Sequence, residues 1–234
     1  MKNTYTFIAE YLEWCSNANR WFSLLPLCSY RGHANSGWPL IPTLGRGLNI
    51  KGETLRLMEK EIIQAFRGEF DLKDWKDLEV LAYARHHGAP TRLMDWTENP
   101  LIALWFSVSE PALDECDGRV FQLNMLNNNQ NLCCAMGVSL EHSEKCQHAH
   151  VFSCPTRVER GRKQHSVFVM PRFDDESALH PLEQTAKENL RDMRIPFSIK
   201  KRLREALLAL GLDPYRIYGG PESFGKLLAL RFGV

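Results

Sequence analysis

Apolar residues return every third or fourth position in several stretches of this 234-residue chain. That spacing predicts helices, each with one buried face. The predicted helices cover residues 4–14, 53–70, 74–86, 101–109 and 199–210. Asn99 and Pro100 are a good N-cap and first helical residue for the fourth of these, and Ser198 is the expected N-cap of the last. A further helix is expected to end near Leu230.

Shorter apolar runs predict strands between these helices. The predicted strands cover residues 24–30, 118–124, 166–170 and 215–218. Arg31 follows the first strand directly. The chain shows no internal repeat and no long polar linker. We therefore predict one α+β domain over residues 1–234, with a mixed sheet, flanking helices and an Asn/Cys/His-rich insertion at about 125–155.

The charged residues nearly cancel, with 29 basic and 28 acidic side chains and a formal net charge of +1. This balance excludes a polybasic or acidic-tail protein, so a nucleic-acid site would have to be local. Two local basic clusters are present. They contain Arg157, Arg160, Arg162 and Lys163, and Lys200, Lys201, Arg202 and Arg204. No apolar run reaches the roughly 18 residues that span a bilayer, so we expect no membrane association and a cytoplasmic protein.

The seven cysteines are an odd number without a regular framework, which favours reduced thiols. One group of cysteines and histidines has the residue types that zinc prefers. It consists of Cys133, Cys134, His142, Cys146, His148, His150 and Cys154. Because the spacing matches no known zinc pattern, we expect no metal site.

The most polar part of the chain, residues 84–100, lies between two apolar helices and reads ARHHGAPTRLMDWTENP. Polar groups held between buried elements must find partners or form a site. We predict that Arg92 and Asp95 form an ion pair that braces this loop. The side chains expected nearer a ligand are those of His86, His87, Thr91 and Trp96.

Several motifs together resemble the FRG domain family. They are Tyr30-Arg31-Gly32 with Trp38 and Pro42 after it, the 84–100 segment with Ala103 and Phe106, Arg162-x-Gln164-x-x-x-Phe168, and Ile195-Pro196. The resemblance extends from about residue 25 to 230. Family members commonly end with an F-P-D-L-D-G-like element, where this chain has Tyr218-Gly-Gly-Pro-Glu222-Ser. The insertion at 125–155 also has no counterpart in the family.

A second resemblance is to ADP-ribosyltransferases of the R-S-E type, and it rests on the order of three residues. It implies that Arg31 binds the phosphates of NAD, that Ser166 lies in the nicotinamide pocket with Gln164 nearby, and that Glu222 contacts the nicotinamide ribose. A guanidinium suits phosphate and a carboxylate suits an oxocarbenium-like ribosyl centre. Simpler interpretations exist: an acid is favoured in the first turn of any helix, and Arg31 could pair with Asp95.

Three classes of function therefore remain open. The first is an enzyme that acts on the nicotinamide ribose bond of NAD, an ADP-ribosyltransferase or NAD glycohydrolase, in a bacterial or phage toxin or defence effector with an unidentified macromolecular acceptor. The second is a nucleic-acid-binding or nucleic-acid-processing protein, which would use the basic clusters and stack bases on Trp96, Phe168 or Tyr218. The third is a non-catalytic interaction module.

Overall fold

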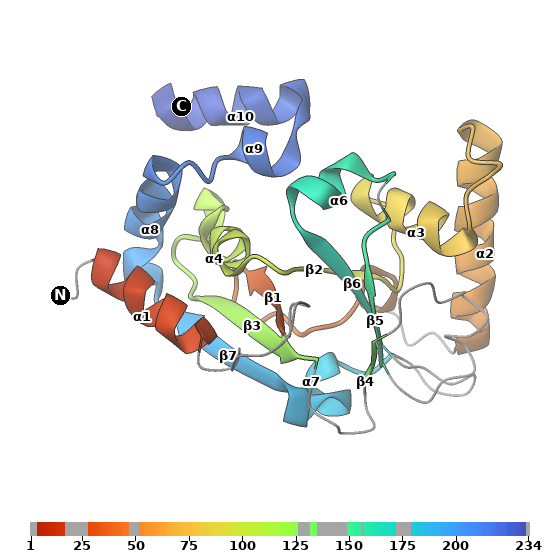
Figure 1. Cartoon of the computed structure of the whole chain (residues 1–234), viewed down its shortest axis with the longest axis horizontal. Coiled ribbons are helices and arrows are strands. Elements are labelled where there is room, and N and C mark those ends of the chain that lie inside the picture. Colours follow the sequence, from red (N-terminus) through yellow and green to blue (C-terminus); the bar gives the residue numbers. More distant parts are fainter. Residues whose placement is uncertain are drawn as a thin grey trace.

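The computed structural model describes residues 4–16, 28–46, 52–125, 132–134, 149–155, 157–171 and 179–232. One sheet lies at the centre, with helices on both sides and at its ends (Figure 1). This arrangement confirms the predicted α+β fold with a mixed sheet. No described helix is long and apolar enough to cross a membrane.

The sheet has seven strands in the order β4-β5-β6-β2-β1-β3-β7 within the described part of the chain. β4 and β5 are parallel, and the other neighbours are antiparallel. The strands are β1 Cys28–His33, β2 Met94–Thr97, β3 Gly118–Asn124, β4 Leu132–Cys134, β5 Ala149–Ser153, β6 Ser166–Met170 and β7 Leu190–Ile195. As predicted, Arg31 and Ser166 lie in the same sheet, on strands that flank β2.

The described helices are α1 Thr4–Ser16, α2 Gly52–Glu69, α3 Asp77–His86, α4 Pro100–Val108, α6 Glu159–Lys163, α7 Leu182–Thr185, α8 Phe197–Ala209, α9 Pro214–Tyr218 and α10 Gly220–Phe232. The six predicted helices correspond to α1, α2, α3, α4, α8 and α10, with ends shifted by a few residues, whereas α6, α7 and α9 were not predicted. α4 begins as predicted, because the Asn99 side chain accepts a hydrogen bond from the Leu101 amide at 2.9 Å.

The structure corrects two predictions at the C-terminal end. Residues 215–218 are not a strand: they lie in α9, because the Asp213 side chain caps the Arg216 amide at 2.9 Å and Pro214 occupies the first helical position. α8 begins two residues earlier than expected, at Phe197, so Pro196 rather than Ser198 is its N-cap residue. β2, β4, β5 and β7 were not predicted as strands.

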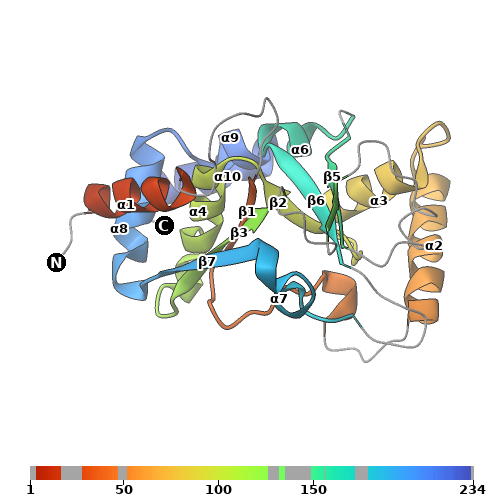
Figure 2. The same cartoon turned by 60° about the horizontal axis from the view of Figure 1, so that its bottom comes forward.

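α4 packs directly against β1, and Gly32 is the reason that it can. A Cβ atom at this position would lie 2.0 Å from the Ala103 carbonyl oxygen in α4. The glycine of the Tyr-Arg-Gly motif therefore serves close packing of helix on strand. α1 and α8 lie beside α4 in both views and complete this side of the core (Figures 1 and 2).

Two further large core clusters lie elsewhere in the described part of the molecule. α7 contributes Leu182 to a cluster that contains Trp96 and Phe121 from the sheet. α2 and α3 cover β5 and β6 at the other end, where Phe152 and Phe168 are buried. α2 and α3 also stand together at one end of the molecule in both views (Figure 2).

Candidate functional site

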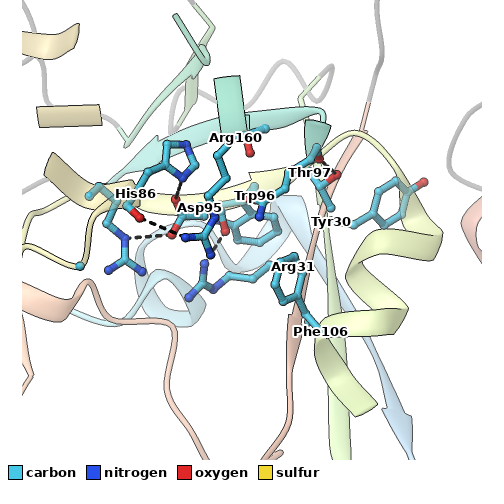
Figure 3. Close-up of a pocket in the computed structure, with 13 residues that line it drawn as sticks. Tyr30, Arg31, His86, Asp95, Trp96, Thr97, Phe106 and Arg160 are labelled. Atoms are coloured by element: carbon cyan, nitrogen blue, oxygen red, sulfur yellow. Dashed lines mark hydrogen bonds and ion pairs between the residues drawn. The ribbon is translucent and has the colours of Figure 1, made fainter. Parts of the chain in front are cut away.

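A pocket of about 340 Å³ opens where β1, β2 and β6 meet α3, α4 and α6. Its side chains come from strands in the middle of the sheet and from the ends of the surrounding helices (Figure 3). The lining residues are Tyr30, Arg31, Gly32, Arg85, His86, Gly88, Asp95, Trp96, Thr97, Phe106, Arg160, Gln164 and Ser166. The pocket therefore combines aromatic rings with three arginines and one acid.

The three arginines are all held by the segment from His86 to Asp95. Arg31 donates from Nη1 to the Asp95 carbonyl oxygen. Arg85 donates from Nε to Asp95 Oδ2 at 2.8 Å and from Nη1 to the Thr43 hydroxyl at 2.9 Å. Arg160 donates from Nη1 to the His86 carbonyl oxygen at 3.2 Å. Figure 3 shows Arg31 and Arg160 reaching toward Asp95 from different elements.

Each of these guanidinium groups keeps one terminal nitrogen for a ligand. Within the described residues, no group accepts a hydrogen bond from Nη2 of Arg31, Arg85 or Arg160. Burial lowers the pKa of Arg31 to about 10, with the Asp95 charge opposing this shift and Arg85 adding to it. Arg31 is still a cation at neutral pH. The pocket thus contains three positively charged groups, each with a hydrogen-bond donor that the described residues do not use.

Three buried polar atoms on the pocket wall also lack a hydrogen-bond partner in the part of the chain that the structure describes. They are Trp96 Nε1, Gln164 Nε2 and Asp95 Oδ1. Buried polar atoms in folded proteins nearly always have a partner. Two hydrogen-bond donors and one acceptor on the pocket wall can therefore bond to water or to a ligand.

Two buried histidines close to the pocket arginines have lowered pKa values, and the ring of one of them, His33, bonds to Arg31. Burial, followed by the charge of Arg31, lowers the pKa of His33 to about 3. Its Nε2 accepts from Arg31 Nε at 3.0 Å, which leaves Nδ1 as the donor to the Trp38 carbonyl oxygen at 3.2 Å. Burial likewise lowers the pKa of His86, although Asp95 opposes the shift.

α6 brings Arg160 to the pocket because Gly161 follows it. A Cβ atom at Gly161 would lie 2.0 Å from Cys154 Sγ and 3.1 Å from His86 Nε2. Only glycine lets α6 lie this close to α3 and to the end of β5. The short helix therefore has its place fixed by packing, and Arg160 projects from it.

Six of the predicted site residues line this pocket: Arg31, His86, Asp95, Trp96, Gln164 and Ser166. Four others do not, and one of these, Glu222, lines the second pocket described below. Thr91 and Arg92 are buried behind the first pocket, with 0% and 1% of their surface exposed. His87 is exposed, and its ring centroid lies 4.4 Å from that of Tyr83.

The predicted ion pair between Arg92 and Asp95 is wrong in its partners. Arg92 pairs with Glu59 of α2, with Nη2 2.6 Å and Nε 2.7 Å from Oε2, and both side chains are 1% exposed. Asp95 pairs with Arg85. Two pairs thus brace the segment, one to α2 below the pocket and one within the pocket wall. Glu59 was missed although it falls on the buried stripe of α2, four residues after Leu55.

Glu222 lies in a second pocket, of about 450 Å³, between α4, α6, α9 and α10. The residue is exposed, in the first turn of α10. Arg160 lines both pockets, and its guanidinium carbon lies 4.9 Å from the centroid of the Tyr218 ring. The structure therefore brings Arg31 and Ser166 together and places Glu222 in the neighbouring pocket.

Two of the four basic residues of α8 are structural, whereas Lys201 and Arg202 are exposed. Lys200 is fully buried and donates to the carbonyl oxygens of Ala34, Leu113 and Cys116 at 2.5 to 3.0 Å. Arg204 makes a two-pronged pair with Asp114 at 2.6 and 2.9 Å. These two cations face the protein interior and make their hydrogen bonds within the protein. The predicted stacking residues Trp96 and Phe168 are buried as well.

Much of the predicted Cys/His cluster lies outside the described residues. Within the described ones, no group of three or more His, Cys, Asp or Glu side chains could hold a metal ion. Four cysteines are described with their side chains, and all are free thiols: Cys15, Cys28, Cys116 and Cys154. The expectation that the chain binds no metal stays a prediction.

Fold and site together define an α+β protein with an arginine-lined pocket built on the middle strands of one sheet. Residues 27–116 match the model of the FRG domain, and the chain therefore carries an FRG domain. The matched residues include Arg31, Arg85 and Asp95, whereas Arg160, Gln164 and Ser166 come from outside the match. No curated protein and no solved structure matches the chain.

Proposed function

We propose that this FRG-domain protein binds NAD through its pyrophosphate in the arginine-lined pocket and cleaves the nicotinamide ribose bond, by ADP-ribosyl transfer or by hydrolysis. The observation that carries the proposal is the set of three guanidinium groups that turn to one pocket, each with Nη2 unused by the described residues. A planar guanidinium matches the oxygens of a phosphate in two-pronged contacts.

The charge of the pocket supports an anionic ligand. Three arginines face a single carboxylate, that of Asp95. A pyrophosphate would meet the three unused nitrogens and offset the excess of positive charge. The unpartnered donors of Trp96 and Gln164 suit the hydroxyl and carbonyl oxygens of a nucleotide.

The chemistry at the ribose needs a carboxylate near the carbon that loses nicotinamide. This carbon becomes positively charged as the bond breaks, and a negative charge beside it lowers the barrier. The R-S-E resemblance implies Glu222 for this role, with Arg31 and Ser166 as its companions, but the side chain lines the neighbouring pocket. Across Arg160 from the first pocket, Glu222 would have to act on a ligand that reaches into both pockets.

Consumption or transfer of ADP-ribose is a reaction by which a bacterial or phage toxin or defence effector would act on its target cell. Such a protein would work in the cytoplasm, where NAD is available. The free thiols of the described cysteines are in keeping with this setting.

A direct test is the release of nicotinamide from NAD by the purified protein, with NAD affinity measured by calorimetry. Arg31→Lys should weaken NAD binding about tenfold, because an ammonium cannot reproduce the fork that bonds to His33 and Asp95 while Nη2 stays available to a phosphate. The matched control is Arg202→Lys. Arg202 is an exposed residue of α8, and this variant should bind NAD as the wild type does. A wild-type protein that neither binds NAD nor releases nicotinamide would remove the proposal.

The second candidate is binding of single-stranded nucleic acid along α6, where Arg157, Arg162 and Lys163 are exposed beside Arg160. A strand could place one phosphate in the pocket and others along this helix. Binding of short RNA or DNA, compared at two salt concentrations, would distinguish this candidate from NAD binding. A protein that binds neither class of ligand would favour an interaction module.

A further inference from the structure

We propose that Asp95, rather than Glu222, is the carboxylate that stabilises the ribosyl centre and receives the proton of the attacking water. This inference rests on the proposed function and assigns its catalytic acid. It follows from three features of Asp95: its place in the sheet, the state of its two oxygens and its isolation as the pocket's one acid.

Asp95 lies at the centre of the pocket because β2 is a middle strand. β2 pairs with β1, which carries Arg31, and with β6, which begins at Ser166. In β2, Met94 and Trp96 belong to the hydrophobic core, and Asp95 alternates with them along the strand. Within the set of residues that line this pocket, Asp95 is the only acid.

The two carboxylate oxygens of Asp95 differ in their contacts. Oδ2 accepts from Arg85 Nε at 2.8 Å, which fixes the side chain. Oδ1 is buried and has no hydrogen-bond partner in the described part of the chain. The Nδ1 atom of His86 lies 3.9 Å from Oδ1, too far for a hydrogen bond. The carboxylate is thus oriented by one oxygen and keeps the other for a ligand.

Hydrolysis at this site can be written with every atom placed. The bond between the ribose carbon and the nicotinamide nitrogen breaks, and its electron pair stays on the nitrogen, which neutralises the ring. Asp95 Oδ1 accepts a hydrogen bond from a ribose hydroxyl and stabilises the positive charge on the carbon. The oxygen of a water molecule then bonds to that carbon. The proton that the water loses passes to Asp95 and on to solvent, so NAD and water give ADP-ribose, nicotinamide and a proton.

Glu222 is a weaker candidate on the same criteria. It is exposed, and it stands in the first turn of α10, where an acid is favoured by the helix dipole whatever its function. It lines the second pocket, and Arg160 lies where the two pockets meet.

The deciding experiment compares Asp95→Asn, Glu222→Gln and the control Asp192→Asn. Asp192 is an ion-paired aspartate on β7, held by Arg119 at 2.9 Å and distant from the lining residues in the sheet order. Asp95→Asn should lower the turnover number for nicotinamide release about 100- to 1000-fold, while the two other variants stay within about threefold of wild type. Its affinity for ADP-ribose should hold or rise, because the amide removes the pocket's one negative charge; a residue with only a structural role would lose affinity instead.

The outcomes separate the two proposals. Loss of turnover in Glu222→Gln with normal turnover in Asp95→Asn would overturn the assignment of Asp95 and leave NAD cleavage intact. A wild-type protein without NAD turnover would defeat the proposed function itself. If Asp95→Asn fails to fold, Asp95→Glu replaces it. That variant keeps the charge and moves the oxygens by about one bond length, so it should fold and bind ADP-ribose but lose turnover, and normal turnover would count against the assignment.

Discussion

Two groups of basic side chains in this molecule differ in how many of their hydrogen-bond donors the protein itself uses. On α8, the Lys200 ammonium is surrounded by three carbonyl oxygens, and the Arg204 guanidinium is matched by both oxygens of Asp114. In the pocket, Arg31, Arg85 and Arg160 each keep Nη2 without an acceptor in the described residues. The donors of the first group are used by internal contacts, whereas the second group keeps donors that would meet the phosphates of the proposed ligand.

This difference teaches that the count of basic residues in a segment says little about its partner. The α8 cluster is as rich in positive charge as the segment around α6. The number of donors left over after the internal hydrogen bonds are assigned is what distinguishes a structural cation from a binding one. The predictions below test this distinction, from the largest expected effect to the smallest.

Lys200→Met should lower the free energy of unfolding by about 3 kcal/mol, because three buried carbonyl oxygens lose a charged donor. Chemical denaturation measures this effect. Lys201→Met changes the exposed neighbour and should stay within about 0.5 kcal/mol of wild type. Equal stability of the two variants would mean that Lys200 is not a structural cation.

Arg160→Gln should lower ligand affinity and leave stability nearly unchanged, in contrast to Lys200→Met. Its affinity for ADP-ribose should fall about 10- to 100-fold, equivalent to roughly 1.5 to 3 kcal/mol, because a charged donor to phosphate is lost. Stability should change by less than about 1 kcal/mol, since Arg160 makes one long hydrogen bond to a backbone oxygen. The control is Arg162→Gln, whose side chain is exposed on the same helix. Equal affinity of the two variants would place Arg160 outside the binding site.

Acid should destabilise the protein through His33, which holds Arg31. Its pKa is about 3 when folded, against about 6.5 for an exposed histidine. The unfolded chain therefore binds a proton between these values that the folded chain does not, so stability is complete above pH 6.5 and falls as the pH drops toward 3. By pH 5 the loss is about 2 kcal/mol.

His33→Gln should lose less stability than wild type between pH 6.5 and pH 5, measured by denaturant unfolding at each pH. The remaining loss in the variant includes His86, whose pKa is also lowered by burial. An equally steep loss in both proteins would place the responsible proton elsewhere.

The smallest effect concerns nucleic acid. If the pocket arginines serve a nucleotide, replacing the exposed Arg157 and Arg162 by alanine should leave ADP-ribose affinity within about twofold of wild type. A short RNA should show little binding at either low or moderate salt. Tight, salt-sensitive RNA binding that this double variant abolishes would favour the nucleic-acid candidate.

Sequence periodicity predicted α1, α2, α3, α4, α8 and α10, because the spacing of apolar residues in a helix is a local signal. The prediction that Arg31 and Ser166 share one sheet is also confirmed. It failed where a local pattern had two meanings. The Tyr215-to-Tyr218 run alternates like a strand, yet the cap from Asp213 and the proline after it make it a helix. β2 has four residues and a polar pattern, so the segment around Asp95 was predicted to be a loop.

The pocket was predictable only in part. Residues 84–100 were identified by their density of polar groups, and six predicted site residues do meet. The partners could not be read from the order of the chain. Glu59 reaches Arg92 from 33 residues away, and Arg160 joins the pocket through the close packing of Gly161 on His86 and Cys154.

The central claim, that the pocket arginines bind the phosphates of a nucleotide, is tested most directly by calorimetric titration of the wild-type protein with ADP-ribose and with adenosine. The two ligands share the base and a ribose, so any difference in affinity reports on the pyrophosphate and the second ribose attached to it. ADP-ribose should bind with one molecule per chain, and adenosine should bind at least about 100-fold more weakly. Equal affinities, or no binding of ADP-ribose, would contradict the account.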